Sequence, residues 1–325
     1  MLNVTDMTKK GIAVVGTLLV DNLYEISAYP AEGELTQIKS VKLACGGLVP
    51  NNGIGLKKIA PDMPVFAVGK VGNDDAGKFA LNTMAAAGVD VTAVKIAGDE
   101  RTSFTDVMSV TGAQRTFFTY PGACATFGAA DVPFDKLPIS MMHLGYFLLL
   151  EAVDNGEGLA ILKEAKRRGI KTSIDLVSEN SDRYQLVLPV LPYVDNLIIN
   201  ELEAGKLAGM EPTPENLPLI AERLLDMGVG ERVIIHMPSM GLCKTREALT
   251  VLPSTKLPKG FVVGKTGAGD AFCSGALIGI AEGLSDAEIL ELAEAAAVSS
   301  LTAADATSGI LPKEELLCNI RKLER

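Results

Sequence analysis

Two kinds of hydrophobic pattern alternate along the 325-residue chain. Short runs rich in apolar and β-branched residues are typical of strands that are buried on both faces of a sheet. These runs are 11–16, 65–71, 172–176, 197–200 and 232–237. Between them lie stretches with apolar residues at helical spacing, namely 74–87, 156–168, 214–227, 285–304 and 312–323. The alternation predicts an α/β protein with a mostly parallel central sheet and helices on both of its faces.

Two regions, 17–44 and roughly 95–125, interrupt this alternation. Polar and apolar residues alternate within them around the turn signal Thr111-Gly112, which predicts antiparallel strands. Each region is too short to form an independent domain, and no Pro/Gly/Ser-rich linker divides the chain. We therefore expect a single α/β domain over residues 1–325, with the two regions forming a small β-lid at one edge of the main sheet.

Charge and composition narrow the range of functions. The chain carries 40 Asp and Glu against 30 Lys and Arg, a formal net charge of −10, and it has no run of basic residues. Nucleic-acid binders neutralise phosphates with such residues, so we expect no nucleic-acid partner. Only His143 and His236 supply imidazoles, which argues against a His-rich zinc site and against chemistry that needs several histidines.

The cysteines and the apolar segments indicate where the protein resides. The cysteines are odd in number, widely spaced and form no C-x-x-C motif, so we expect neither disulfides nor a metal knuckle, and we interpret them as small apolar fillers. They are Cys45, Cys124, Cys243, Cys273 and Cys318. Residues 1–16 contain no apolar stretch typical of a signal peptide, and 144–150 is too short to cross a bilayer. These features predict a cytoplasmic protein without a membrane partner.

Two familiar phosphate-binding patterns fail in this sequence. Gly264-Lys265-Thr266 resembles the end of a P-loop, but Lys259 stands where the first glycine belongs. The dinucleotide fingerprint also fails, because Lys58 follows Gly53 and Gly55 at the position of the third glycine. The hypothesis that the protein is a nicotinamide-dependent dehydrogenase therefore loses its main support.

A different glycine motif, Gly267-Ala268-Gly269-Asp270, opens a stretch of small residues. Two glycines permit a tight turn, and a helix that begins near Gly269 points unpaired N–H groups at a common anion site. Asp270 in the first turn would then lie where it can accept a proton from a hydroxyl that attacks phosphorus. The alternative is a plain turn in which Asp270 only complements the helix dipole.

A second glycine pair precedes another helix. Gly46 and Gly47 come just before Pro50, which suits a first helical turn, and Asn51 offers both a donor and an acceptor. Such groups are suited to binding a polyol. The alternative is a loop that ends the lid and a solvated Asn.

These motifs, taken in order, resemble those of the PfkB carbohydrate kinase family, the ribokinase-like sugar and nucleoside kinases. The similarity covers nearly the whole chain. VVGTLLVD resembles the family's first strand with its substrate-binding Asp, and Gly46 to Asn51 matches G-G-x-x-x-N. NELEAGKLAG matches N-x-x-E, and KTGAGDAFCSGAL matches the G-A-G-D signature. The resemblance implies a three-layer ribokinase-like fold.

The resemblance also implies roles for individual residues. Asp270 would be the general base, and the N–H groups of Gly267, Ala268 and Gly269 would form an anion hole for the transferred phosphoryl group of ATP. Asp21, Gly46, Gly47 and Asn51 would bind the sugar. The nucleotide side would involve Asn200, Glu203, Gly241, Lys265 and Thr266. Glu203 would hold Mg²⁺, through water.

Two segments depart from the family pattern. Gly264 and Lys265 stand where the family has Asp-Thr. The segment 236–241 keeps only its last residue, Gly241, of the family's glycine motif. Pro238 removes a backbone donor there. Lys265 is interpreted either as a phosphate contact or as a solvated loop residue, and His236 as a packed strand-end residue.

The sequence thus predicts an ATP- and Mg²⁺-dependent kinase that phosphorylates a hydroxyl of a sugar or sugar-like substrate. One alternative is a nucleoside kinase of the same family, because the lid contains the aromatic residues Phe104, Phe117, Phe118 and Tyr120. Another is a catalytically silent sugar-binding or regulatory member. The resemblance further suggests a role for a monovalent cation and a homodimer formed through the lid.

Overall fold

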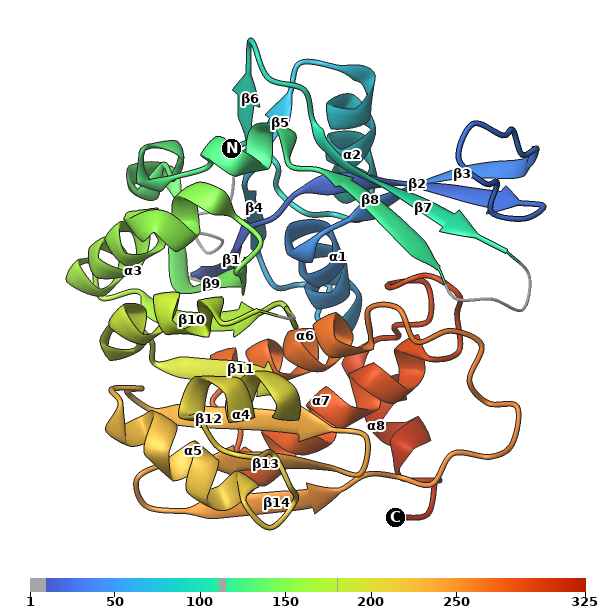
Figure 1. Cartoon of the computed structure of the whole chain (residues 1–325). Helices are drawn as coiled ribbons and strands as arrows, with labels where there is room; N and C mark the ends of the chain where they lie inside the picture. The colour runs from blue at the N-terminus through green and yellow to red at the C-terminus, as the bar shows by residue number, and fades with distance from the viewer. Residues whose placement is uncertain (1–9, 111–114, 180) are drawn as a thin grey trace, which may run out of the picture.

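The structure is a computed structural model that describes residues 10–110, 115–179 and 181–325 (Figure 1). The turn signal Thr111-Gly112 and the first nine residues lie outside this described part.

The architecture is built on a sheet of eight strands in the order β14-β13-β12-β11-β10-β9-β1-β4. The strands from β12 to β4 in this order pair in parallel, and β13 and β14 extend the sheet as antiparallel edge strands. Their bounds are β1 Gly11–Gly16, β4 Val65–Val68, β9 Ile139–Phe147, β10 Lys171–Leu176, β11 Asn196–Asn200, β12 Arg232–Met237, β13 Met240–Lys244 and β14 Leu249–Pro253.

Helices cover both faces of this sheet (Figure 1). On one face lie α1 (Leu48–Ile59), α2 (Asp75–Ala86), α6 (Ala268–Ala281), α7 (Asp286–Ser300) and α8 (Lys313–Ile320). On the other lie α3 (Gly158–Arg167), α4 (Glu201–Ala208) and α5 (Leu217–Asp226), with short 3-10 helices among them. The predicted α/β class with a mostly parallel sheet is confirmed.

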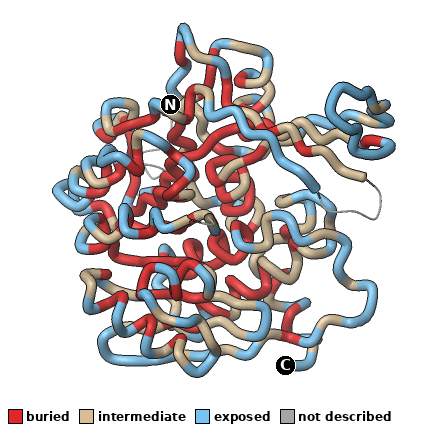
Figure 2. Tube along the Cα trace, viewed as in Figure 1, coloured by how far each residue is buried: buried red, intermediate tan, exposed pale blue. Residues whose placement is uncertain are grey.

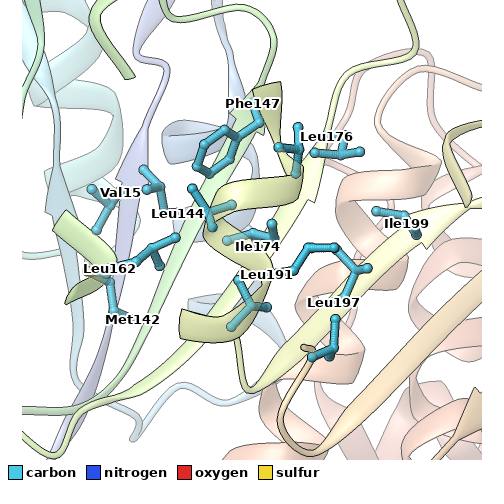
Figure 3. Close-up of a cluster of buried hydrophobic side chains, with 14 of the residues drawn as sticks. Val15, Met142, Leu144, Phe147, Leu162, Ile174, Leu176, Leu191, Leu197 and Ile199 are labelled. Atoms are coloured by element: carbon cyan, nitrogen blue, oxygen red, sulfur yellow. The ribbon is translucent and has the colours of Figure 1, made fainter. Parts of the chain in front are cut away.

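The alternation of side chains along β1 explains why two separate cores form. Ile12 and Val14 point to the layer of α1 and α6, whereas Ala13 and Val15 point to the layer of α3. All four are fully buried, because successive residues of a strand face opposite sides of the sheet. Figure 3 shows part of the core on the α3 side of the sheet, where Val15, Met142 and Leu162 pack with residues of β10 and β11. Buried segments accordingly run through the middle of the molecule in Figure 2.

A second, four-stranded sheet projects from one side of the molecule (Figure 1). Its order is β3-β2-β7-β8, with β2 Leu19–Ile26, β3 Ile38–Gly46, β7 Ser103–Ser109 and β8 Thr116–Tyr120. β2 pairs with β3, and β7 with β8, in antiparallel fashion, but β2 and β7 pair in parallel. We call these four strands the small sheet.

Several predicted elements have different bounds in the structure. The expected strand at 65–71 divides at Gly69 into β4 and β5 (Lys70–Gly72), because β5 pairs with β6 (Lys95–Ala97) outside both larger sheets. The helix expected from 156 begins at Gly158, because Gly156 has φ +115°, which no helix accommodates. The helix expected at 285–304 ends at Ser300.

The cysteines are only partly the apolar fillers that the sequence suggested. Cys124, Cys243 and Cys273 are buried, Cys45 is half-buried, and Cys318 is exposed, so that interpretation is wrong for Cys318. All five are free thiols. Among the residues that the structure describes, no helix is long and apolar enough to cross a membrane.

Helices α6 and α7 approach closely because α6 is rich in small residues. A Cβ at Gly275 would lie 2.6 Å from the carbonyl oxygen of Leu292 and 2.7 Å from Cα of Ala293. Backbone atoms cannot move aside as a flexible side chain can. The small-residue run after Asp270 therefore fixes the distance between α6 and its neighbour.

We expect Gly275→Ala to lower the free energy of unfolding by about 1–3 kcal/mol, the usual cost of overpacking. Chemical denaturation measures the change. Gly98→Ala is the matched control, because a Cβ at Gly98 meets no atom within 4 Å. Equal stabilities of the two variants would contradict close α6–α7 packing.

Candidate functional site

A cavity of about 320 Å³ opens at the carboxyl ends of the parallel strands. In parallel α/β sheets this edge is where ligands bind, because loops and helix starts converge there. β9, β10, β11, β12 and the start of α6 all contribute to its wall. The lining residues that carry polar side chains are Tyr146, Asp175, Ser178, Asn200, Glu203, His236, Lys265, Asp270 and Cys273.

The Gly267-Asp270 motif forms one side of the cavity. Gly267 precedes α6 with φ +76°, a left-handed conformation that favours glycine. A Cβ there would also lie 2.3 Å from Cβ of Ala306. Gly267, Ala268 and Gly269 line the cavity, and the first N–H groups of a helix have no partner within that helix. The motif is therefore a helix start that faces the cavity and not a plain surface turn.

Asp270 lies in the first turn of α6 and is only 7% exposed. Asn51 Nδ2 donates a hydrogen bond to Asp270 Oδ2 over 2.8 Å, although the two residues are 219 positions apart. The Tyr146 hydroxyl donates to both carboxylate oxygens, at 2.9 and 3.1 Å. Desolvation, and second the nearby charge of Asp175, raise the pKa of Asp270 to about 7. The carboxyl group is thus held in a fixed position with a pKa near neutrality.

Tyr146 and Asp175 were not singled out from the sequence. Tyr146 has φ +57°, unusual for a bulky residue, and its backbone N–H donates to Asp175 Oδ1 over 2.6 Å. Leu148, at φ +77°, donates its N–H to Asp154 Oδ1 over 2.8 Å. Strained backbone of this kind clusters at functional sites. The sequence gives no signal for it, because the strained conformation at the end of β9 accompanies contacts with other parts of the fold.

Asn200 and Glu203 form a capping box at the start of α4. Each side chain accepts a hydrogen bond from the other's backbone N–H, at 2.9 and 3.1 Å. Ser178 joins them, donating its hydroxyl to Glu203 Oε1 over 2.9 Å and accepting from Asn200 Nδ2. Glu203 is 4% exposed, and desolvation raises its pKa to about 7. It is therefore a buried cavity group and not an exposed helix residue.

The second glycine pair meets Asp21 at the base of the small sheet. A Cβ at Gly46 would lie 2.4 Å from Asp21 Oδ2, so glycine leaves room for this carboxylate. Gly47 precedes α1 with φ +87°. Desolvation raises the pKa of Asp21 to about 6. α1 then carries Asn51 to Asp270, so the second glycine motif and the G-A-G-D motif meet through Asn51.

The other residues predicted to bind the nucleotide do not all line the cavity. Lys265 lines the cavity, and Thr266 accepts a hydrogen bond from Arg115 Nη1 over 3.3 Å. Gly241 does not line the cavity, because it pairs with His236 in the β12–β13 ladder and faces Leu290. His236 lines the cavity with its ring 4.7 Å from that of Phe272, and desolvation lowers its pKa to about 4.

The charge pattern of the cavity defines what it can do. Asp175, Glu203 and Asp270 contribute three carboxyl groups, and Lys265 is the cation among the lining residues that the structure describes. A neutral hydroxyl could be deprotonated by Asp270, while a phosphate would be held by the helix start, Lys265 and a metal ion. An α/β fold with such a cavity is what a phosphoryl-transfer enzyme would need.

Comparison with known proteins extends this conclusion. Residues 9–314 match the model of the pfkB family carbohydrate kinases. The chain is 26% identical over 289 residues to a ribokinase of Arabidopsis thaliana, covering 88% of this chain and 74% of that protein. It is also 26% identical to a fructokinase of Klebsiella pneumoniae, covering 94% and 97%. The structure of the Arabidopsis thaliana ribokinase complexed with ribose and ATP superposes with a TM-score of 0.83 at 23% identity, over 97% and 99% of the two chains.

The chain belongs to the pfkB family of carbohydrate kinases. The predicted ribokinase-like fold is confirmed, and the protein is an ATP-dependent carbohydrate kinase.

The raised pKa values also predict how stability depends on pH. A carboxyl group whose pKa is higher in the folded than in the unfolded chain stabilises the fold fully below its unfolded pKa of about 4. That contribution is lost as pH rises through the folded pKa, which is about 7 for Asp270. Asp270→Asn removes this group. Between pH 5 and pH 8 the free energy of unfolding of the wild type should therefore decrease by about 2–3 kcal/mol more than that of the variant.

Urea denaturation at the two pH values measures this difference. The exposed Asp62→Asn is the control, and its pH dependence should equal that of the wild type. An Asp270→Asn variant with an unchanged pH dependence would show that Asp270 ionises normally.

Proposed function

We propose that the protein transfers the γ-phosphate of ATP to a hydroxyl of a sugar, with Asp270 as the general base. The observation that carries this proposal is the position of Asp270: it is buried, held by Asn51 and Tyr146, and located where the start of α6 meets the cavity. A base with a pKa near the working pH accepts protons most effectively. The raised pKa of about 7 therefore suits this role.

In the proposed reaction the sugar oxygen attacks the γ-phosphorus while Asp270 accepts the hydroxyl proton. The bond between the γ-phosphorus and the bridging oxygen breaks, and ADP leaves. Phosphoryl transfer depends mainly on positioning and on stabilisation of charge. The N–H groups of Gly267, Ala268 and Gly269 would supply that stabilisation as an anion hole, since fixed dipoles require no reorganisation. Lys265 would add a cationic contact, with Thr266 beside it.

Glu203 and Asn200 would hold Mg²⁺, partly through water. Mg²⁺ prefers oxygen ligands and keeps several of its waters. The residues fit such an ion: Glu203 is a buried carboxyl, and the Ser178 hydroxyl lines the same cavity beside it. When bound, Mg²⁺ would neutralise phosphate charge in a cavity that is otherwise acidic. The requirement for a monovalent cation stays a prediction.

Asp21, Gly46, Gly47 and Asn51 would bind the sugar hydroxyls. Their location at the base of the small sheet supports the proposal that this sheet is a lid of the single domain. Arg115, just before β8, already contacts Thr266 beside the anion hole. Closure of such a lid would exclude water from the transfer.

A small polyol is the favoured substrate class, because the relatives named above include a ribokinase and a fructokinase. A nucleoside kinase is not better supported, although Phe117 and Phe118 are exposed on the small sheet. The small sheet also exposes Ile38, Val41, Leu43 and Tyr120. Such a face supports the proposed homodimer through the lid, which sedimentation would test.

A substrate panel tests the function directly. ADP release is measured with Mg²⁺ and ATP across pentoses, hexoses, keto-acids and nucleosides. Turnover of a sugar is the expected result. Turnover of nucleosides alone would favour the nucleoside kinase, and sugar binding without any turnover would favour the silent regulatory member.

We expect Asp270→Asn to lower kcat by roughly 10²–10⁴-fold, the usual contribution of a general base, with a smaller change in KM. In the wild type kcat should rise with pH up to about 7 and then level off, because Asp270 must be deprotonated. Asp106→Asn, a carboxyl group on the small sheet outside the cavity, is the comparison variant. Full kcat in Asp270→Asn would exclude Asp270 as the base.

We expect Arg115→Ala to lower kcat/KM by roughly 10–100-fold, since a hydrogen bond to a charged group contributes about 1.5–3 kcal/mol. The reason is that Arg115 brings a positive charge to the loop that surrounds the anion hole. Steady-state kinetics with varied ATP measures the effect. Arg246→Ala, whose partner is Asp226, is the matched control. Equal kinetics of both variants would assign Arg115 no role in the transfer.

A further inference from the structure

Three side chains with good metal ligands meet beside the cavity, and two of them line it. They are His143 on β9, Asp175 on β10 and Cys273 on α6, and all three are buried. Their nearest ligand atoms lie within 4.8 Å of one another. The role proposed for Asp270 uses neither His143 nor Cys273. Their convergence from three separate elements therefore needs its own explanation.

Hydrogen bonding among the three groups is weak. The His143 ring is fully buried, and its Nε2 lies 3.6 Å from Asp175 Oδ2, beyond a normal hydrogen bond. The same Nε2 lies 3.4 Å from Cys273 Sγ, and a thiol is a weak donor and a weak acceptor. The ring nitrogen thus faces two groups without a strong bond to either.

Two of the three separations between the ligand atoms match those of a tetrahedral metal ion, and the third lies within 4.8 Å. With bonds of about 2.0–2.3 Å from zinc to nitrogen, oxygen and sulfur, ligands at tetrahedral angles are separated by about 3.3–3.6 Å. The two separations that involve His143 are 3.4 and 3.6 Å. Asp175 and Cys273 also line the cavity, so a fourth position would open toward solvent or substrate. Three protein ligands with one open position are typical of reactive zinc sites.

The surroundings of the three side chains support a ligand as well. His143 Nδ1 lies 3.0 Å from the Ser173 hydroxyl, the kind of outer contact that orients a metal-binding imidazole. Asn52 is fully buried next to Cys273, and neither polar atom of its amide has a hydrogen-bond partner of normal geometry. A buried polar group without a partner is costly. The neighbouring group that this amide contacts, the Cys273 thiol, is a weak hydrogen-bonding partner, so an ion with its water would give the amide a stronger one.

We propose that His143, Asp175 and Cys273 form a binding site for a thiophilic divalent cation of the Zn²⁺ class, separate from the proposed Mg²⁺ site at Glu203. A sulfur ligand selects Zn²⁺ over Mg²⁺, which prefers oxygen. On binding, the Cys273 S–H bond breaks, its proton leaves to solvent and a sulfur–metal bond forms. Asp175 also accepts the backbone N–H of Tyr146, so an ion here would disturb the group that positions Asp270. The ion would therefore inhibit phosphoryl transfer, an effect that rests on the proposed function, whereas binding does not.

Titration of the metal-free protein with Cd²⁺ tests binding without any kinase assay. Cd²⁺ stands in for Zn²⁺ because its bond to a thiolate gives an ultraviolet charge-transfer band. We expect this band to saturate at one Cd²⁺ per chain and to be absent in Cys273→Ser. His143→Asn tests the imidazole if Cys273→Ser fails to fold. Ser173→Ala should weaken Zn²⁺ binding by about 10–100-fold, the usual effect of removing an outer contact.

Two controls make the outcome decisive. Cys318→Ser removes the exposed thiol, and Glu203→Gln alters the proposed Mg²⁺ site; both should keep the band. A band that disappears in Cys318→Ser but persists in Cys273→Ser would overturn the proposal, as would no binding of Cd²⁺ or Zn²⁺ to the wild type. In the kinase assay, Zn²⁺ should inhibit the wild type more than Cys273→Ser, each relative to its own rate without Zn²⁺. Binding without inhibition would confirm the site and contradict only the part that rests on the kinase reaction.

Discussion

The burial of one carboxyl group, Asp270, is the constraint on which the site depends. An ionised carboxylate that leaves water loses its hydration, and the protein must replace it with donors in fixed positions. Here the donors are Asn51 Nδ2 and the Tyr146 hydroxyl, and the first comes from α1, more than two hundred residues earlier in the chain. Their number is too small to offset desolvation fully, so the pKa of Asp270 rises to about 7. The same incomplete compensation of desolvation that weakens the fold at high pH suits Asp270 to the role of base proposed for it.

The strained backbone around Tyr146 follows from this constraint. Tyr146 lies near the end of β9, where the ladder with β10 shifts its register, and its hydroxyl reaches Asp270 from there. Tyr146 and Leu148 adopt left-handed conformations, and carboxylates of Asp175 and Asp154 accept their backbone N–H groups. Asp175 in turn adds negative charge near Asp270 and contributes to its raised pKa. The position of the Tyr146 hydroxyl, the strained backbone and the raised pKa of Asp270 therefore depend on the same set of contacts.

Close packing of α6 against neighbouring helices places the start of α6 beside the strand ends that form the rest of the cavity wall. α6 lies against α1 and α7, and glycine at position 275 lets the α7 backbone approach it. The start of α6 then reaches the cavity beside the ends of β10 and β11, where Asp175, Asn200 and Glu203 are located. The overall charge of −10 says little about this place. In the proposed mechanism, anion binding would depend there on backbone N–H groups, on Lys265 and on a metal ion, because local dipoles dominate at short range.

The sequence by itself determined the α/β class, the order of most buried strands and helices, and the helix start at Gly267-Asp270. These are local features: hydrophobic periodicity and glycine spacing act within a few residues. It did not reveal β9, whose segment contains Met, His and Gly in place of a β-branched run, nor the parallel pairing of β2 with β7. Only the tertiary structure decided that Glu203 is buried, that Gly241 stays outside the cavity, and that Tyr146 and Asp175 join Asp270. The physical reason is that desolvation and hydrogen bonding depend on contacts between residues far apart in the chain, which no local pattern contains.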